Sequence, residues 1–281
     1  MFPSIPGPEH AIQDSVIVRA LAGVVVAGAV TAGARKTRTL SASGQCAAFV
    51  IGVLATAAGW WWAVTLIGFF VTSAALTRWR SREKLQRTEG TLPRSAERNA
   101  AQVGANGGLF VLLALLGRYT GNELLDAAAL GALAAASSDT WSTEFGTLFG
   151  GTPHLITTGG AVEPGMSGGV TAAGFGAGAA GALFIALLGA FAVSGHHSRL
   201  TTAAAMGGFG GCLADSLIGA TLQSKRFCDG CGRWTERQVH DCGFRTRHAR
   251  GVNWLSNDGV NLCGTLAGAV IAALAGWLMV R

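Results

Sequence analysis

Charged residues are scarce in this sequence. Only 13% of its 281 residues are Asp, Glu, Lys or Arg, about half the share that is usual in soluble domains. Half of the residues are hydrophobic, and the mean hydropathy is +0.41. This composition excludes a disordered chain and a secreted disulfide scaffold, and it argues against a cytosolic enzyme. We therefore expect a polytopic membrane protein that forms a single integral-membrane domain over residues 1–281.

Proline is also rare, and the apolar runs show no strand-like alternation. Three of the six prolines lie in the first eight residues, and none interrupts an apolar run. The runs are continuous, which argues against a β-barrel. The 42 glycines follow no collagen-like period and favour helices that pack closely in lipid. The expected fold class is therefore all-α.

Eight apolar segments are each at or near the length that crosses about 30 Å of hydrocarbon. We expect a Gly-rich bundle of about eight transmembrane helices, with a range of six to eight because the fourth and fifth segments are short. The segments are 15–33, 40–58, 60–77, 102–117, 123–138, 168–193, 201–223 and 259–280.

Lys and Arg are concentrated in alternate loops between these segments. The first, third, fifth and seventh loops hold 3, 7, 0 and 7 of them, whereas the other three loops hold 0, 1 and 1. The positive-inside rule then places the odd loops in the cytoplasm and both termini outside. Glu9 and Asp14 precede the first segment, which is unlike a cleaved signal peptide. We expect a multi-pass protein of the cell membrane whose active face is cytoplasmic.

Three aspartates lie at the expected cytoplasmic ends of separate apolar segments. They are Asp139, Asp215 and Asp258. Charged groups at such places are costly and are usually functional. We therefore interpret the three as catalytic residues and as ligands of Mg²⁺.

Other polar residues accompany these aspartates. Asn99, Gln102 and Asn106 share one helix face by their spacing. Gly168 and Gly169 form a Gly-Gly turn before the next expected helix, and such a turn can present backbone N–H groups to phosphate. Interhelical hydrogen bonds and caps are the structural alternative. The candidate substrate- and nucleotide-binding residues are Lys84, Arg98, Asn99, Gln102, Asn106, Ser138, Thr140, Glu144, Ser167, Gly168, Gly169, Ser216, Asn257 and Asn261.

This combination of residue types indicates a particular chemistry. Carboxylates beside amide and hydroxyl oxygens suit Mg²⁺, which prefers a few carboxylates together with substrate phosphate oxygens. The basic flanks suit the phosphates, although attraction to anionic lipid headgroups would also explain many arginines. No Gly-Lys-Ser/Thr follows the Gly-Gly turn, so it is not a P-loop. The pattern favours phosphoryl or nucleotidyl transfer.

The region 224–256 is predicted to be a cytoplasmic insertion with its own metal site. Cys228, Cys231, His240 and Cys242 supply four tetrahedral ligands at a spacing typical of structural zinc. Disulfides are disfavoured on the cytoplasmic side. We expect Zn²⁺ to fold a small basic ribbon, with unmetallated thiols or conditional disulfides as the alternative.

Five ordered motifs resemble those of an integral-membrane family that was long labelled a domain of unknown function and includes the chloroplast phytyl-phosphate kinase. The family is similar, more distantly, to CTP-dependent polyprenol kinases and CDP-diacylglycerol synthases. The motifs are RNAAQVGANGG at 98–108, SDTW at 138–141, GGVT at 168–171, DSLIGA at 215–220 and NDGVN at 257–261.

The resemblance implies CTP-dependent phosphorylation of an isoprenyl monophosphate to the diphosphate, with Mg²⁺. The polyprenol kinases have a Lys/Ser-rich stretch where this chain reads TTGGA at 157–161. That lysine is absent here, so the phosphate contact is expected from Lys84, Arg98, Lys225 or Arg226.

Three other functions remain open at this stage. A CTP:lipid-phosphate cytidylyltransferase would use the same substrates but would attack the α-phosphorus. An ion-coupled transporter would need its polar residues near the membrane midplane, and a noncatalytic lipid-binding scaffold would need no divalent ion. The expected partners are CTP or another nucleoside triphosphate, an isoprenyl monophosphate and membrane lipids, but no nucleic acid. The prenyl chain length and the oligomeric state are left open.

Overall fold

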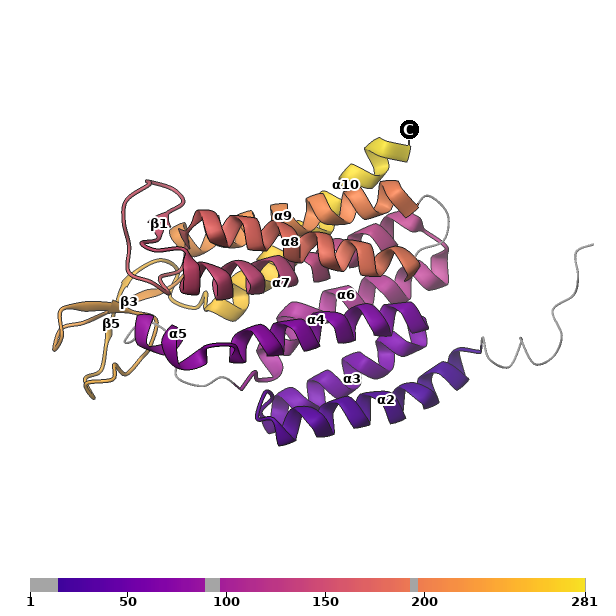
Figure 1. The fold of residues 1–281 in the computed structure, drawn as a ribbon, viewed down its shortest axis with the longest axis horizontal. Helices are drawn as coiled ribbons and strands as arrows, with labels where there is room; N and C mark the ends of the chain where they lie inside the picture. The colour runs from indigo at the N-terminus through magenta and orange to yellow at the C-terminus, as the bar shows by residue number, and fades with distance from the viewer. Residues whose placement is uncertain (1–14, 89–96, 193–196, 281) are drawn as a thin grey trace, which may run out of the picture.

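The computed structural model describes residues 15–88, 97–192 and 197–280 (Figure 1). Glu9, Asp14 and Arg94, which entered the topology prediction, lie outside these residues. Eight long helices follow the eight apolar segments in order. They are α2 (Val16–Lys36), α3 (Ala42–Ala58), α4 (Trp60–Arg78), α6 (Ala100–Thr120), α7 (Glu123–Phe149), α8 (Ala172–Gly189, continued by the 3₁₀ turn η1, Ala190–Ala192), α9 (His197–Thr221) and α10 (Asn257–Val280).

Six of these helices are long and apolar enough to cross a membrane. They are α2, α4, α6, α8, α9 and α10. Helix α3 is apolar but has only 17 residues, and α7 has 27 residues. The prediction of an all-α polytopic membrane protein with six to eight spans is confirmed.

Helix α7 is longer than the sequence suggests. The predicted segment ends at Ser138, but the helix continues to Phe149 and ends where the Gly150 N–H bonds to the Gly146 carbonyl. The predicted segment therefore ends too early, and Glu144, which follows that segment in the sequence, lies within the helix. No proline or glycine interrupts residues 139–145, and the Thr140 hydroxyl donates to the Ala136 carbonyl within the helix.

A short helix that the sequence analysis did not anticipate lies in the basic third loop. Helix α5 (Ser81–Arg87) begins after Arg80, and Glu83 pairs with both Arg80 and Arg87. The Arg87 guanidinium also donates to the carbonyl of Leu148, 2.7 Å away, at the end of α7. A cation at a helix C-terminus is favourable, so Arg87 of α5 stabilises the C-terminal end of α7.

Helix α7 lies at the centre of the bundle and packs against α6, α8, α9 and α10. Every residue from 127 to 138 is buried, and most are alanine. A Cβ atom on Gly131 would lie 2.5 Å from the carbonyl oxygen of Gly268, and one on Gly207 would lie 2.4 Å from the same oxygen. Small residues thus bring the backbones of α7, α9 and α10 into contact, which lets their polar side chains meet.

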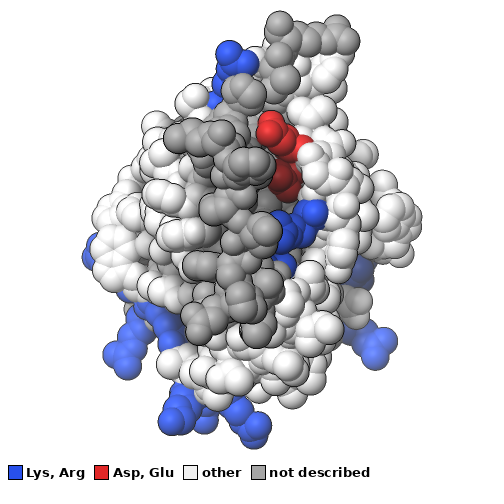
Figure 2. Space-filling model, turned by 90° about the vertical axis from the view of Figure 1, so that its right-hand side faces the viewer, with Lys and Arg blue, Asp and Glu red and all other residues white. Residues whose placement is uncertain are grey.

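All of the short strands lie at one end of the bundle (Figure 1). Strands β1 (His154–Leu155) and β2 (Gly169–Val170) form an antiparallel pair between α7 and α8. Strands β3 (Lys225–Cys228), β4 (Arg233–Thr235) and β5 (Arg247–Arg250) form an antiparallel sheet in the order β4-β3-β5 between α9 and α10. We call this sheet with its loops the ribbon. Figure 2 views the opposite end of the molecule, where uncharged residues predominate on the described surface.

Candidate functional site

Four helices contribute to a small polar pocket that lies toward the ribbon end of the bundle. We call it the carboxylate pocket; its empty volume is about 180 Å³. Asp139 comes from α7, Asp215 from α9, Asn261 from α10 and Asn106 from α6. Ala135, Ala136, Gly211, Gly264 and Thr265 complete its lining. The structure therefore brings together residues from four of the five sequence motifs.

The two carboxylates of this pocket lack conventional partners. Neither Asp139 nor Asp215 forms a hydrogen bond with a described residue, and their negative charges lie close enough to repel each other. Arg98 is the cation whose charge acts on Asp139. Two carboxylates that share one site cannot both remain ionised at low energy without a cation or a proton. The pocket thus has the oxygen-rich, electronegative character that suits a hard divalent ion.

Asp258 does not line the carboxylate pocket. It lies half-buried in the first turn of α10, three residues before Asn261 and about 4.5 Å nearer the helix start. Asn257 is exposed beside it, and Ser216 follows Asp215 without lining the pocket. Thr265 lines the pocket and was missed, although its spacing of four residues from Asn261 places it on the same helix face.

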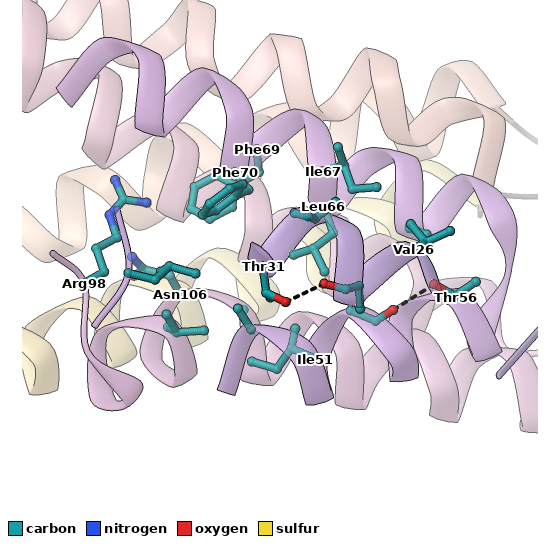
Figure 3. Close-up of a pocket in the computed structure, with 18 of the residues that line it drawn as sticks. Val26, Thr31, Ile51, Thr56, Leu66, Ile67, Phe69, Phe70, Arg98 and Asn106 are labelled. Atoms are coloured by element: carbon teal, nitrogen blue, oxygen red, sulfur yellow. Dashed lines mark hydrogen bonds between the residues drawn. The ribbon is translucent and has the colours of Figure 1, made fainter. Parts of the chain in front are cut away.

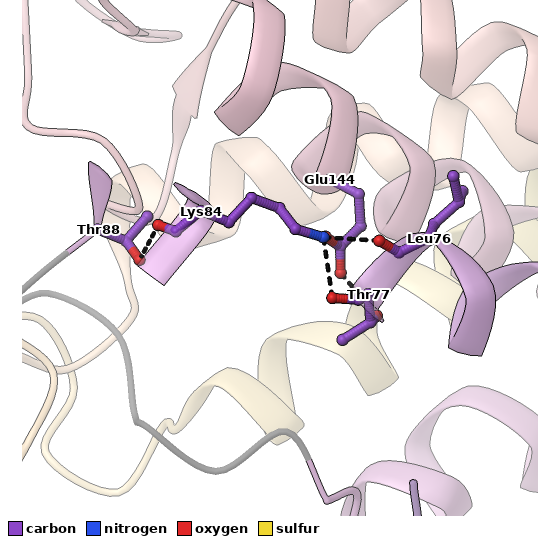
Figure 4. Close-up of polar contacts among 5 residues, drawn as sticks. All are labelled: Leu76, Thr77, Lys84, Thr88 and Glu144. Atoms are coloured by element: carbon purple, nitrogen blue, oxygen red, sulfur yellow. Dashed lines mark hydrogen bonds and ion pairs between the residues drawn. The ribbon is translucent and has the colours of Figure 1, made fainter. Parts of the chain in front are cut away.

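Lys84 and Glu144 are engaged with each other (Figure 4). The Lys84 ammonium forms a short ion pair with Glu144 and donates to the carbonyls of Leu76 at 2.6 Å and Thr77 at 2.9 Å. An ammonium has three N–H donors, and all three are used. The Thr77 hydroxyl donates to the second Glu144 oxygen. These contacts join α4, α5 and α7, and they leave Lys84 no donor for a phosphate.

Asn99 and Gln102 form the cap of α6. The Gln102 N–H donates to the Asn99 side chain at 3.0 Å, and the Asn99 N–H donates to the Gln102 side chain at 3.1 Å. This reciprocal arrangement is a capping box. It fixes the start of the helix that carries Asn106.

Arg98 is held by its backbone and leaves its side chain free. Its N–H donates to the Thr39 carbonyl at 3.0 Å, and its carbonyl accepts from the Ser41 N–H at 3.1 Å. The guanidinium forms no hydrogen bond with a described residue. Burial lowers the pKa of Arg98, and the negative charges of Glu144 and Asp139 oppose that effect. A half-buried guanidinium with no hydrogen-bond acceptor among the described residues is a candidate for binding phosphate.

Ser138 and Thr140 lie outside the carboxylate pocket. Ser138 is fully buried, and a Cβ on Gly178 of α8 would lie 3.1 Å from its hydroxyl oxygen. The Thr140 hydroxyl is occupied by its own helix. Both therefore contribute to the packing of α7 in this structure.

The Gly-Gly turn packs directly on the end of α9. Gly168 has a φ of +81°, and a Cβ there would lie 2.5 Å from the Cα of Ala220. Only glycine fits such a contact at a positive φ. The turn, which continues into Gly169 of β2, is thereby fixed against the helix that carries Asp215.

Ser167 connects this turn to the ribbon. Its hydroxyl forms a short hydrogen bond to Glu236, and its carbonyl accepts from the Lys225 ammonium at 2.9 Å. Burial raises the pKa of Glu236, whereas the hydrogen bond from Ser167 and the charge of Lys225 lower it. Glu236, which the sequence analysis missed, thus links the ribbon to the Gly-Gly turn.

The four Cys and His residues of the ribbon form one cluster. Their ligand atoms all lie within 4.8 Å of one another. Cys228 Sγ lies 3.5 Å from Cys242 Sγ, and His240 Nδ1 lies 3.1 Å from Cys242 Sγ. The sulfur separation is far longer than a disulfide bond of about 2.05 Å and suits two thiolates that share a tetrahedral metal. The cysteines are free thiols, so the geometry fits a metal-binding cluster.

Comparisons with known proteins agree with this architecture. The chain is 29% identical to "Protein PGR" of Arabidopsis thaliana over 288 residues, which covers 94% of this chain and 98% of the relative. It is 30% identical over 242 residues to the "Uncharacterized membrane protein MJ0933" of Methanocaldococcus jannaschii, covering 85% and 87% of the two chains.

A third relative is "Protein VTE6, chloroplastic" of Arabidopsis thaliana, 25% identical over 254 residues, with 84% of this chain and 65% of the relative covered. No solved structure matches the chain with significance. The family described as "Integral membrane protein DUF92" matches residues 25–269. The chain therefore belongs to the DUF92 family of integral membrane proteins.

Proposed function

We propose that this protein is a lipid kinase that transfers the γ-phosphoryl group of CTP to an isoprenyl monophosphate. The observation that carries the proposal is the carboxylate pocket, where Asp139 and Asp215 face each other without hydrogen-bond partners among the described residues. The substrate class and the nucleotide come from the resemblance of the five motifs to the phytyl-phosphate kinase-like family.

The donor set of the pocket fits Mg²⁺, because it combines two carboxylates with the amide oxygens of Asn106 and Asn261. Asp139 and Asp215 would hold the ion, which supplies neutralisation of the nucleotide phosphates. An acceptor phosphate monoester is already ionised at neutral pH, so no strong general base is required. The chain must instead hold two polyanions together, and Arg98 offers N–H donors for this task.

The position of the pocket favours an enzyme over a transporter. Asp215 lies six residues before the ribbon end of α9, Asn106 six residues after the start of α6, and Asn261 four residues after the start of α10. A transporter site is expected near the midplane. In this proposal the ribbon end, which carries the Lys- and Arg-rich loops, faces the cytoplasm.

The ribbon cluster is proposed to hold one structural Zn²⁺. Cys228, Cys231, His240 and Cys242 would occupy all four positions, which leaves none for a substrate. The ion would fold the ribbon, and the ribbon in turn would support the turn at Ser167.

Product analysis tests the proposed reaction. Purified protein in nanodiscs should be incubated with Mg²⁺, geranylgeranyl monophosphate and CTP labelled at either the α- or the γ-phosphate. We expect the γ-label alone to enter the lipid, which becomes a diphosphate. Transfer of the α-label with release of pyrophosphate would contradict the proposal and establish the cytidylyltransferase. If neither label enters the lipid, the chain is not an enzyme of this class.

A further inference from the structure

A second and larger pocket lies between α2, α3, α4 and α6 (Figure 3). Its empty volume is about 760 Å³, part of which is open to the surroundings. We call it the apolar pocket, because most of its lining side chains are aliphatic or aromatic, among them Ile51, Leu66, Phe69 and Phe70.

The two threonines of this pocket do not make it polar. The Thr31 hydroxyl donates to the Ala27 carbonyl at 2.7 Å, and the Thr56 hydroxyl donates to the Gly52 carbonyl at 2.8 Å. Both hydroxyls are therefore satisfied by their own helices. An occupant meets a hydrocarbon-like wall over most of the pocket, which suits a hydrocarbon chain and no polar metabolite.

One end of the apolar pocket has a different character. Figure 3 shows Arg98 and Asn106 at this end and Val26 and Thr56 at the other. The Arg98 guanidinium forms no hydrogen bond with a described residue, so it offers its donors to an occupant. Asn106 lines both the apolar pocket and the carboxylate pocket. A molecule whose anionic head reaches Arg98 therefore lies beside Asp139 and Asp215.

The length of the pocket is limited. Its wall on α3 runs from Ala48 to Thr56, which is about 12 Å along a helix. Ala63 of α4 is buried at the far end, 7% exposed. A single chain fits this space, and among the described residues that line it Arg98 provides the one cation.

We infer that the apolar pocket binds the hydrocarbon chain of a single-chain lipid monophosphate, with the phosphate at Arg98, and that residues around Ala63 set the accepted chain length. This inference rests on the proposed function for the identity of the lipid. Its physical basis is the match between an apolar wall, one free guanidinium and a shared boundary with the carboxylate pocket.

Equilibrium binding without nucleotide tests the inference apart from catalysis. Labelled C10 and C20 isoprenyl monophosphates should bind saturably to wild-type protein in nanodiscs. Ala63→Leu shortens the pocket, so we expect it to weaken C20 binding at least tenfold relative to C10. Leu66→Ala enlarges the pocket and should shift the preference toward C20. Arg98→Gln should weaken both lipids at least tenfold, because it removes the cation that meets the phosphate.

Ala75→Leu is the matched control, because it makes the same change on an exposed position of the same helix. It should leave both affinities unchanged. If Ala63→Leu fails to fold, the opposite shift expected from Leu66→Ala still decides the question. Unlabelled dioleoyl phosphatidate should not displace the isoprenyl monophosphates, whereas equal displacement would show a general site for anionic lipids and overturn the inference.

The outcomes separate this inference from the proposed function. Equal binding of C10 and C20 in wild type and all variants would overturn the pocket assignment, even if phosphoryl transfer is observed. Length-dependent binding that responds to Ala63→Leu and Arg98→Gln would support the assignment, even if product analysis finds no kinase activity.

Discussion

Asp139→Asn and Asp215→Asn should each lower turnover about a hundredfold or more, while the protein still inserts and folds. Each change keeps the shape of the side chain and removes one of the two charges that face each other in the carboxylate pocket. Loss of a charge-stabilising contact at a reacting centre commonly costs about 3 kcal/mol in the barrier. Transfer of the γ-label into the lipid, measured under single-turnover conditions, gives the rate.

Two further aspartates provide controls for this result. Asp126 lies on α7 but 13 residues from Asp139, about 20 Å along the helix, so Asp126→Asn should be mild. Asp258 lies outside the pocket, and its replacement by Asn should cost less than either pocket variant. Near-normal rates in both pocket variants, or a collapse in Asp126→Asn alone, would place the active site elsewhere.

Cys228→Ser combined with Cys231→Ser should abolish zinc binding and destabilise the ribbon. The free energy of Zn²⁺ binding is about 10–16 kcal/mol in small zinc domains. We therefore expect the ribbon to be unfolded without the ion. Turnover should also fall, because the ribbon residues Lys225 and Glu236 hold the turn at Ser167. Metal analysis should find about one Zn²⁺ per wild-type chain and none in the double variant.

Cys46→Ser is the matched control for the zinc experiment. Cys46 is an exposed free thiol on α3, outside the ribbon cluster, so zinc content and turnover should stay at wild-type values. Zinc that persists undiminished in the double variant would reject Cys228 and Cys231 as ligands. Loss of zinc with full turnover would support the metal site but would contradict the claim that the ribbon supports activity through the Gly-Gly turn.

The sequence predicted the helices well because the membrane imposes a length and a composition on each of them. Seven of the eight predicted segments begin and end within a few residues of the ends of the corresponding helix. Helix α7 is the exception. Its residues 139–149 are too polar to be recognised as part of an apolar segment, but they pack against neighbouring elements and remain helical. The short helix α5 was missed for a similar reason, because contacts of Lys84 and Arg87 with α7 stabilise it.

The site was predicted less completely, because helix spacing does not reveal which face meets which neighbour. Asp139, Asp215, Asn106 and Asn261 converge as expected for residues at one end of a bundle. Asp258 belongs to the same turn as Asn261 but does not line the pocket. The pairing of Lys84 with Glu144, and of Ser167 with Glu236, joins residues at least 60 positions apart. Such contacts depend on the tertiary arrangement and have no local sequence signal.

The most direct test of the central claim is electron paramagnetic resonance with Mn²⁺ in place of Mg²⁺. In the presence of CTP, wild-type protein should bind one Mn²⁺ that shows hyperfine coupling to nucleotide phosphorus, as expected for an ion held by carboxylates and phosphate oxygens. Asp139→Asn and Asp215→Asn should lose this signal, whereas Asp126→Asn should retain it. The same signal and affinity in all four proteins would contradict the assignment of the carboxylate pocket as the nucleotide-metal site.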